Sequence, residues 1–171
     1  MTIQRVPVTG GCLCGAVRYE SKEPPTGGGY CHCRICQRSG GGLFNASVSF
    51  AGSAFRFTKG EPCYYRASSF GKRGFCVECG SPIVFFYEGN PHVWIKIGSL
   101  DHPEDWPMTK GASWGRPINA HTATKVQWYE IHDGLPQSTS GWAEAVAAMN
   151  PVPRTVRVTK SGSRAGDPPT R

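Results

Sequence analysis

The spacing of eight cysteines is the feature that most restricts what this chain can fold into. They form a pair, a triplet, a single residue and a second pair: Cys12 and Cys14; Cys31, Cys33 and Cys36; Cys63; Cys76 and Cys79. The opening residues MTIQRVPVTG lack the apolar run of a secretory signal, so we expect a cytoplasmic protein. Thiol buffers there keep cysteines reduced, and clustered thiols then indicate metal or redox chemistry. Disulfides become the alternative if a leader has been removed.

Length and charge further limit the number of domains and the kinds of partner that this chain can have. The chain has 171 residues, which suit one compact domain and are too few for two ordinary ones. No stretch approaches the roughly eighteen apolar residues of a membrane span, so no membrane is expected. The net charge of +7 lies largely in residues 151–171, with five basic residues and one acidic residue. The remainder is near neutral once seven cysteines ionise on two zinc ions, which argues against nucleic-acid binding.

Glycine and proline contribute 22 and 14 residues, with short runs of β-branched and aromatic residues between them. This pattern predicts a mainly β fold of short strands joined by turns. The expected strands are Ala16–Glu20, Leu43–Phe50, Ala54–Thr58, Cys63–Ala67, Pro82–Tyr87, His92–Ile97 and Thr124–Ile131. Helical signal is limited to turns at Arg34–Ser39 and Pro103–Trp106 and to a short helix at Trp142–Met149. We expect one zinc domain over residues 1–150 and a basic, mobile tail over 151–171.

The two cysteine pairs predict a structural zinc site. Such a site takes four ligands in a tetrahedron, commonly as two short-spaced pairs from separate segments, and Cys12–Cys14 and Cys76–Cys79 supply them. In FCVECGSP, Gly80 can adopt the positive φ of a zinc knuckle. Zinc binding on the order of 10 kcal/mol exceeds the net stability of many domains, so loss of one ligand should threaten the fold.

The triplet CHCRIC predicts a different kind of site. Cys31, Cys33 and Cys36 can converge on one ion but leave a tetrahedron one ligand short. An open position is typical of catalytic zinc, where water, a thiol or a carbonyl oxygen can bind. The triplet therefore predicts thiol or carbonyl chemistry.

The alternative is a second closed site completed by a histidine. His32 is a poor candidate, because in an extended C-x-C segment its side chain points away from the two cysteines. His92, His102, His121 and His132 stay open as the fourth ligand.

Three segments carry a resemblance to a known family. GGCLCGAVRYE, CHCRICQRSGG and GFCVECGSPI resemble the three signatures of the glutathione-dependent formaldehyde-activating enzyme family, also called the CENP-V/GFA domain. The later stretch INAHTATKVQWYEIHDGLPQ is similar to the family's closing segment. The resemblance spans roughly Thr9 to Pro136.

The resemblance implies an Mss4-like fold of antiparallel strands with a structural zinc. It implies that the structural zinc is held by Cys12, Cys14, Cys76 and Cys79 and the catalytic zinc by Cys31, Cys33 and Cys36. The implied activity is the condensation of glutathione with formaldehyde to S-(hydroxymethyl)glutathione, classed as a carbon–sulfur lyase. A small thiol and an aldehyde are the partners expected.

Glutathione is anionic, so its site should offer cations and backbone donors near the metal. The nearby basic residues are Arg34, Arg38, Lys72 and Arg73, and each alone is more often a solvated charge. Gly40–Gly42 could bring amides to an anion or only form a turn. The larger aromatic residues are expected in the core or around a cleft: Phe44, Phe75, Phe85, Phe86, Trp94, Trp114 and Trp128. Cys63 is expected to be a buried free thiol.

Two other functions stay open. The domain could be a non-catalytic zinc scaffold or thiol-binding module, because a fold does not determine a function. The C-x2-C spacing also permits cycling between dithiol and disulfide, which tight zinc binding would suppress. The sequence carries no indication of the oligomeric state.

Overall fold

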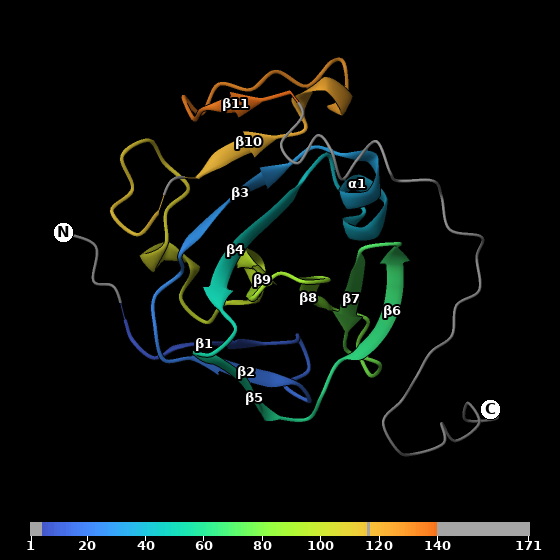
Figure 1. The fold of residues 1–171 in the computed structure, drawn as a ribbon, viewed down its shortest axis with the longest axis vertical. Helices are drawn as coiled ribbons and strands as arrows, with labels where there is room; N and C mark the ends of the chain where they lie inside the picture. Colours follow the sequence, from blue (N-terminus) through green and yellow to red (C-terminus); the bar gives the residue numbers. More distant parts are fainter. Residues whose placement is uncertain (1–4, 116, 140–171) are drawn as a thin grey trace.

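The computed structural model describes residues 5–115 and 117–139, which form two β-sheets and one short α-helix (Figure 1). The smaller sheet has the order β1-β2-β5, with β1 (Val8–Gly11), β2 (Arg18–Ser21) and β5 (Phe55–Lys59). The mainly β class predicted from the sequence is confirmed.

The larger sheet has eight strands in the order β11-β10-β3-β4-β9-β8-β7-β6. Their bounds are β3 (Gly27–Cys31), β4 (Asn45–Ala51), β6 (Cys63–Ser68), β7 (Gly71–Phe75), β8 (Pro82–Tyr87), β9 (His92–Lys96), β10 (Ile118–Ala120) and β11 (Gln137–Ser138). Neighbouring strands are antiparallel from β3 through β6, whereas β10 is parallel to both β3 and β11. The remaining elements are α1 (Arg34–Gly40), η1 (Ile97–Ser99), η2 (Pro103–Asp105) and η3 (Thr122–Thr124).

The core lies between the two sheets, and β4 shows how. Because side chains alternate across a strand, Val48 and Phe50 point to one face and Ser47 and Ser49 to the other. Val48 is fully buried and Phe50 is 1% exposed, and both pack in one apolar cluster with Tyr19 of the smaller sheet. The opposite face of the larger sheet carries the polar Ser47 and Ser49, which are also buried.

Six expected strands are present with small shifts at their ends, as are the helix after Cys33 and the turn at Pro103. The strand expected over Thr124–Ile131 is wrong. Local hydrogen bonds replace a ladder there: the Thr124 N–H and hydroxyl donate to the His121 carbonyl, and the Tyr129 N–H donates to the Val126 carbonyl.

The helix expected at Trp142–Met149 and the tail expected over 151–171 lie outside the described residues. The division into a domain of residues 1–150 and a basic tail stays a prediction.

Candidate functional site

The first cluster joins the turn after β1 to the turn between β7 and β8. The Sγ atoms of Cys12, Cys14, Cys76 and Cys79 all lie within 4.8 Å of one another. The Cys12–Cys14 distance is 3.5 Å and the Cys14–Cys76 distance is 3.8 Å. Sulfurs about 2.3 Å from a tetrahedral zinc are about 3.8 Å apart, so this four-cysteine cluster fits a closed zinc site.

Backbone turns aim polar groups at these sulfurs. Gly80 has φ 73°, the positive value expected for the knuckle, and its N–H donates to the Cys76 carbonyl at 2.9 Å. The Val17 N–H donates to Cys12 Sγ at 3.2 Å. The Ser81 side chain, 3.2 Å from Cys79 Sγ, is the main cause that lowers the pKa of Cys79 to about 6. Burial, in contrast, raises the pKa of Cys76 to about 12, so these contacts favour a thiolate at Cys79 and not at every sulfur of the cluster.

The second cluster forms where β3 ends and α1 begins. Cys31 ends β3, Cys33 precedes the helix and Cys36 lies in its first turn, with all three Sγ atoms within 4.8 Å of one another. The helix begins here because Cys33 Sγ accepts the Cys36 N–H at 3.3 Å, and it ends at Gly41, which has φ 68°. The thiol of Cys33 therefore both caps the helix and belongs to the three-cysteine cluster.

The three-cysteine cluster contains no histidine among the described residues. His32 is 1% exposed, and its Nε2 lies 2.8 Å from Oδ1 of Asn119. Its expected orientation away from the two neighbouring cysteines is consistent with this pairing. The Sγ set offers three donors, which fits an ion that keeps one position for a reactant.

Arg73 on β7 is the basic residue that contacts this cluster. It is 6% exposed, its Nη2 donates to Cys36 Sγ at 3.4 Å, and its guanidinium carbon lies 4.5 Å from the centre of the Phe85 ring. Hydrogen bonds from the Cys31 and Cys33 thiols, supported by Arg73, lower the pKa of Cys36. Arg73 Nε has no hydrogen-bond partner within the described part of the chain.

The other expected cations lie elsewhere. Arg34 hydrogen-bonds Gln37 of its own helix, and Lys72 lies 4.9 Å above the ring of Tyr64. Arg38 is exposed, and Gly41 serves as the helix cap. Of the four basic residues considered, only Arg73 thus reaches the three-cysteine cluster in the described structure.

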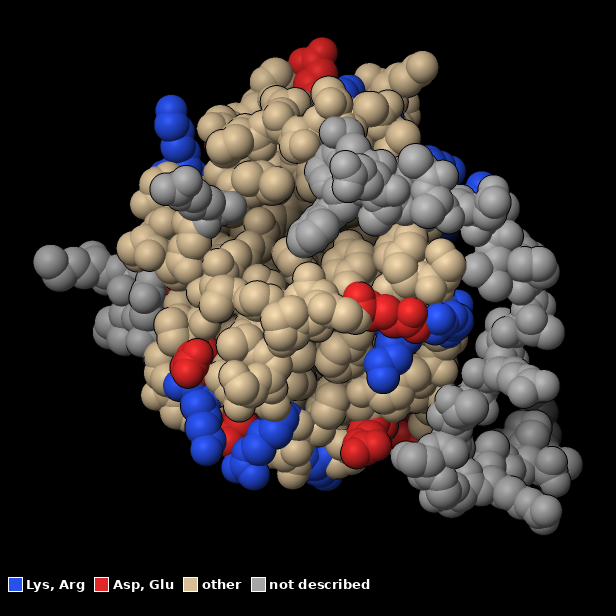
Figure 2. All heavy atoms as spheres, in the orientation of Figure 1, with Lys and Arg blue, Asp and Glu red and all other residues tan. Residues whose placement is uncertain are grey.

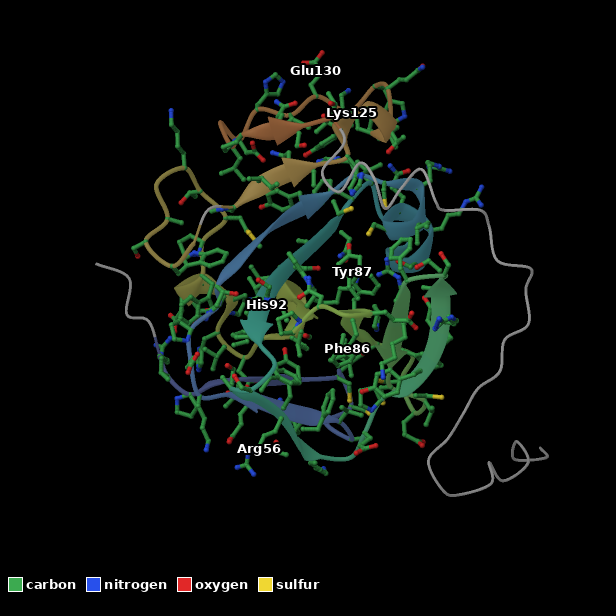
Figure 3. All side chains as sticks on the ribbon, viewed as in Figure 1. Arg56, Phe86, Tyr87, His92, Lys125 and Glu130 are labelled. Atoms are coloured by element: carbon green, nitrogen blue, oxygen red, sulfur yellow. The ribbon has the colours of Figure 1, made fainter. Side chains whose placement is uncertain are left out.

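A cavity of about 460 Å³ opens beside the three-cysteine cluster. Its polar side chains include Cys31, Cys36, Asn45, Ser47, Arg73 and His121, and its apolar ones include Phe85, Tyr87, Trp94 and Ile118. Tyr87 is labelled in Figure 3, below α1 and between β4 and β7 in that view. The cavity was not predicted, although Phe85 and Trp94 were expected at a cleft or in the core.

His121 lies in this cavity in an unusual backbone conformation. Its φ is 59°, and it is the non-glycine residue with positive φ among the residues described. It is 6% exposed, its burial lowers its pKa, and its ring has no hydrogen-bond partner within residues 5–115 and 117–139. Strain of this kind is often kept at functional sites. The sequence raised His121 only as a metal ligand, and the three-cysteine cluster does not include it.

Cys63 belongs to neither cluster. It is 5% exposed within β6, so the prediction of a buried free thiol is confirmed. Trp114 is buried as expected, whereas Trp128 is 73% exposed and fills neither core nor cavity.

The sequence profile described as glutathione-dependent formaldehyde-activating enzyme matches residues 7–114 of this chain. The chain belongs to this family. The matched range contains both cysteine clusters, which confirms the resemblance seen in the three cysteine segments. The stretch 118–137 lies beyond the matched residues, so its similarity to the family's closing segment stays a prediction.

Among solved structures, the chain is similar to that of a Rhodobacter sphaeroides protein from a structural genomics programme. The two are 26% identical, the similarity covers 54% of this chain and 87% of that one, and the TM-score is 0.47. No curated protein sequence matches this family member significantly.

Two further expectations concern surfaces. On the face in Figure 2 the basic and acidic side chains lie close to one another, mostly on its lower half. The expectation of no nucleic-acid partner stays a prediction. Within the described residues, no helix combines the length and apolar character needed to cross a bilayer. The cytoplasmic location stays a prediction.

Proposed function

We propose that this protein is a zinc-dependent carbon–sulfur lyase-type enzyme that condenses glutathione, or a related thiol, with formaldehyde. The product is S-(hydroxymethyl)glutathione. The observation that carries the proposal is the cavity: it brings together the sulfurs of Cys31 and Cys36, the guanidinium of Arg73 and the imidazole of His121. The family's description names the same two reactants.

The donor sets support two zinc ions per chain. Four thiolates from Cys12, Cys14, Cys76 and Cys79 suit a structural ion, and three from Cys31, Cys33 and Cys36 suit a catalytic one. Bound at the second site, zinc would supply Lewis-acid polarisation of a carbonyl or stabilise a substrate thiolate. Arg73 would hold the Cys36 sulfur in place through its hydrogen bond and offset part of the negative charge of three thiolates.

In the proposed reaction His121 would carry the proton that moves, because it lines the same cavity as Cys31 and Cys36. When a thiol adds to an aldehyde, a carbon–sulfur bond forms, the thiol loses its proton, and the carbonyl oxygen gains one. No electrons are exchanged with an outside oxidant. Because burial lowers its pKa, the His121 imidazole is neutral near pH 7 and can accept the thiol proton and return it to oxygen.

Arg73 also favours a thiol substrate that carries a carboxylate. It is the Lys or Arg residue that lines this cavity within the described part of the chain, and it is 6% exposed. A buried guanidinium stabilises a carboxylate at hydrogen-bonding distance. Glutathione carries two carboxylates, so Arg73 should favour its binding over that of neutral thiols of similar size.

The test is NMR exchange spectroscopy on glutathione, formaldehyde and their adduct, with zinc content measured for every sample. We expect the zinc-loaded protein to accelerate exchange above the spontaneous rate, and we expect Cys36→Ser to lose both the acceleration and one zinc equivalent. Cys63→Ser is the matched control, because Cys63 is a buried thiol outside both clusters, and it should keep both. A fully zinc-loaded wild type without acceleration would exclude the proposed reaction and favour the binding-module alternative.

A further inference from the structure

One wall of the cavity consists of aromatic rings. Phe85 and Tyr87 on β8 are edge to face with ring centroids 4.3 Å apart, and Tyr87 and Trp94 are edge to face at 6.3 Å. All three line the cavity together with Ile118 from β10. These residues are not in the main core cluster, against which their neighbour Phe86 packs.

Strand register places the aromatic wall and Cys31 on the same face of the larger sheet. Phe85 is the pairing partner of Trp94 across β8 and β9, and Ser49 on β4 is the partner of Trp94 on its other side. Cys31 on β3 pairs with Asn45, and Ser47 pairs with Gly29. Because alternate residues share a face, the aromatic residues of β8 and β9 and the polar residues of β3 and β4 line one continuous surface.

Glycines leave room for the wall. A Cβ atom at Gly71 would lie 2.7 Å from Cε2 of Phe85, so the absence of a side chain there lets the Phe85 ring lie over β7. Gly27, Gly28 and Gly29 also line the cavity, which keeps the β3 side open. The volume next to the cysteines is therefore bounded by rings on one side and by bare backbone on the other.

Neither proposed reactant uses such a wall. Formaldehyde has no carbon substituent, and glutathione offers polar amides and carboxylates. Three rings and an isoleucine around one cavity match an apolar group, because apolar surface removed from water is stabilised roughly in proportion to its area. A ligand that places such a group against the rings would leave its sulfur near Cys31 and Cys36 and its anionic part near Arg73.

We propose that the cavity binds thiol adducts of aldehydes that carry an aromatic or branched apolar group. The substrate class is an aryl or branched aliphatic aldehyde together with a small anionic thiol, and the thiol half rests on the function proposed above. The reaction is the same addition: sulfur bonds to the carbonyl carbon, and the thiol proton moves to the carbonyl oxygen to give a thiohemiacetal. Phe85, Tyr87, Trp94 and Ile118 form the subsite for the carbon substituent.

Inert thioethers test this binding without turnover. The probes are S-benzylglutathione, S-methylglutathione, benzyl methyl sulfide and dimethyl sulfide, titrated calorimetrically into the zinc-loaded full chain. We expect S-benzylglutathione to bind about tenfold or more tightly than S-methylglutathione, from the area of one buried ring. Trp94→Ala and Ile118→Ala should each reduce that ratio several-fold and leave S-methylglutathione binding nearly unchanged.

Trp128→Ala is the control, because Trp128 is 73% exposed and does not line the cavity. It should keep the full ratio, and zinc content and circular dichroism verify that each variant is folded. Equal binding of the benzyl and methyl conjugates would overturn the subsite, as would a preference that survives both cavity substitutions.

The sulfides separate this inference from the proposed function. Binding of benzyl methyl sulfide over dimethyl sulfide, without binding of either glutathione conjugate, would retain the apolar subsite and reject glutathione as the thiol. Failure of both benzyl compounds to bind more tightly than their methyl counterparts would reject the subsite, whatever happens with glutathione and formaldehyde.

Discussion

His32 and Asn119 are separated by 87 residues in the chain, yet His32 Nε2 lies 2.8 Å from Asn119 Oδ1. The Asn119 amide nitrogen donates to both carboxylate oxygens of Asp133, at 3.0 and 2.9 Å. Its Oδ1 is then the acceptor, so His32 donates through Nε2–H. Since His32 lies between Cys31 and Cys33, this chain of contacts fixes the three-cysteine cluster from a segment beyond the family match.

Asn119→Ala should lower the free energy of unfolding by about 1–3 kcal/mol, because it leaves the buried N–H of His32 without an acceptor. Urea unfolding followed by tryptophan fluorescence measures the change. The exposed Gln127→Ala is the control and should stay close to wild type. An unchanged stability for Asn119→Ala would show that the contact does not hold the cluster.

Cys76→Ser should remove the ion of the four-cysteine cluster and with it the folded state at 37 °C, because that cluster ties β1 to the turn after β7. Cys36→Ser should lose one zinc equivalent and remain folded, since the core lies on the other face of the sheet. Atomic emission and circular dichroism on the same samples give both quantities. Equal loss of fold in the two variants would contradict the division into a structural and a reactive site.

His121→Gln should reduce the enzyme-catalysed exchange rate about 100-fold or more, the usual size of a general acid–base contribution. Zinc content should change little, because His121 belongs to neither cysteine cluster. His132→Gln is the control, since His132 is exposed and its ring lies 2.9 Å from Glu130. Full activity in His121→Gln would assign proton transfer to another group.

Lys96 makes stability depend on pH. Burial, reinforced by the charge of Arg73, lowers its pKa from 10.5 to about 8. Between those two values the unfolded chain keeps a proton that the folded chain has lost, so the Lys96 contribution to stability rises with pH across this window. Below pH 8 the folded protein carries the full cost of a buried ammonium.

Lys96→Met removes that contribution. Its free energy of unfolding should exceed that of wild type near pH 7, and the difference should shrink by on the order of 2 kcal/mol as the pH rises to 10. Parallel urea titrations at pH 7, 8, 9 and 10 measure it. A difference that stays constant over this range would mean that Lys96 keeps its ordinary pKa, stabilised by its hydrogen bond to Asn45.

The cysteine clusters and most of the strands could be predicted from the sequence. Short-spaced thiols predict convergence because the spacing itself limits how far apart the sulfurs can lie, and both clusters formed as expected. Segments that alternate apolar and polar residues, such as that around Val48, also predicted strands well, since an apolar and a polar face of the sheet produce the alternation.

Glycine-rich strands could not be predicted in the same way. β3 reads GGGYC and β7 reads GKRGF, and neither has the β-branched residues that indicate a strand. Their conformation comes from neighbours: Gly29 has φ 146°, and a Cβ there would lie 2.0 Å from the Ile118 carbonyl oxygen. Only the sheet, assembled from distant segments, makes these glycines strand residues.

The cavity could not be predicted from the sequence for a related reason. Its polar and aromatic sides come from separate strands, and their meeting depends on pairings such as Phe85 with Trp94. Register of this kind is set by long-range packing, so no local pattern singles out the lining residues. Arg73 was one of four basic residues considered, and His121 one of several histidines.

The parallel strand β10 has a consequence for how the protein behaves toward its own copies. It covers the outer edge of β3, with Ala120 paired to Cys31 and Ile118 to Gly29. A sheet that ended at β3 would expose a row of free amides and carbonyls on a flat strand of glycines, a template for intermolecular pairing. The short strand β10 thus also protects against aggregation, because it covers the edge of the strand that ends at Cys31.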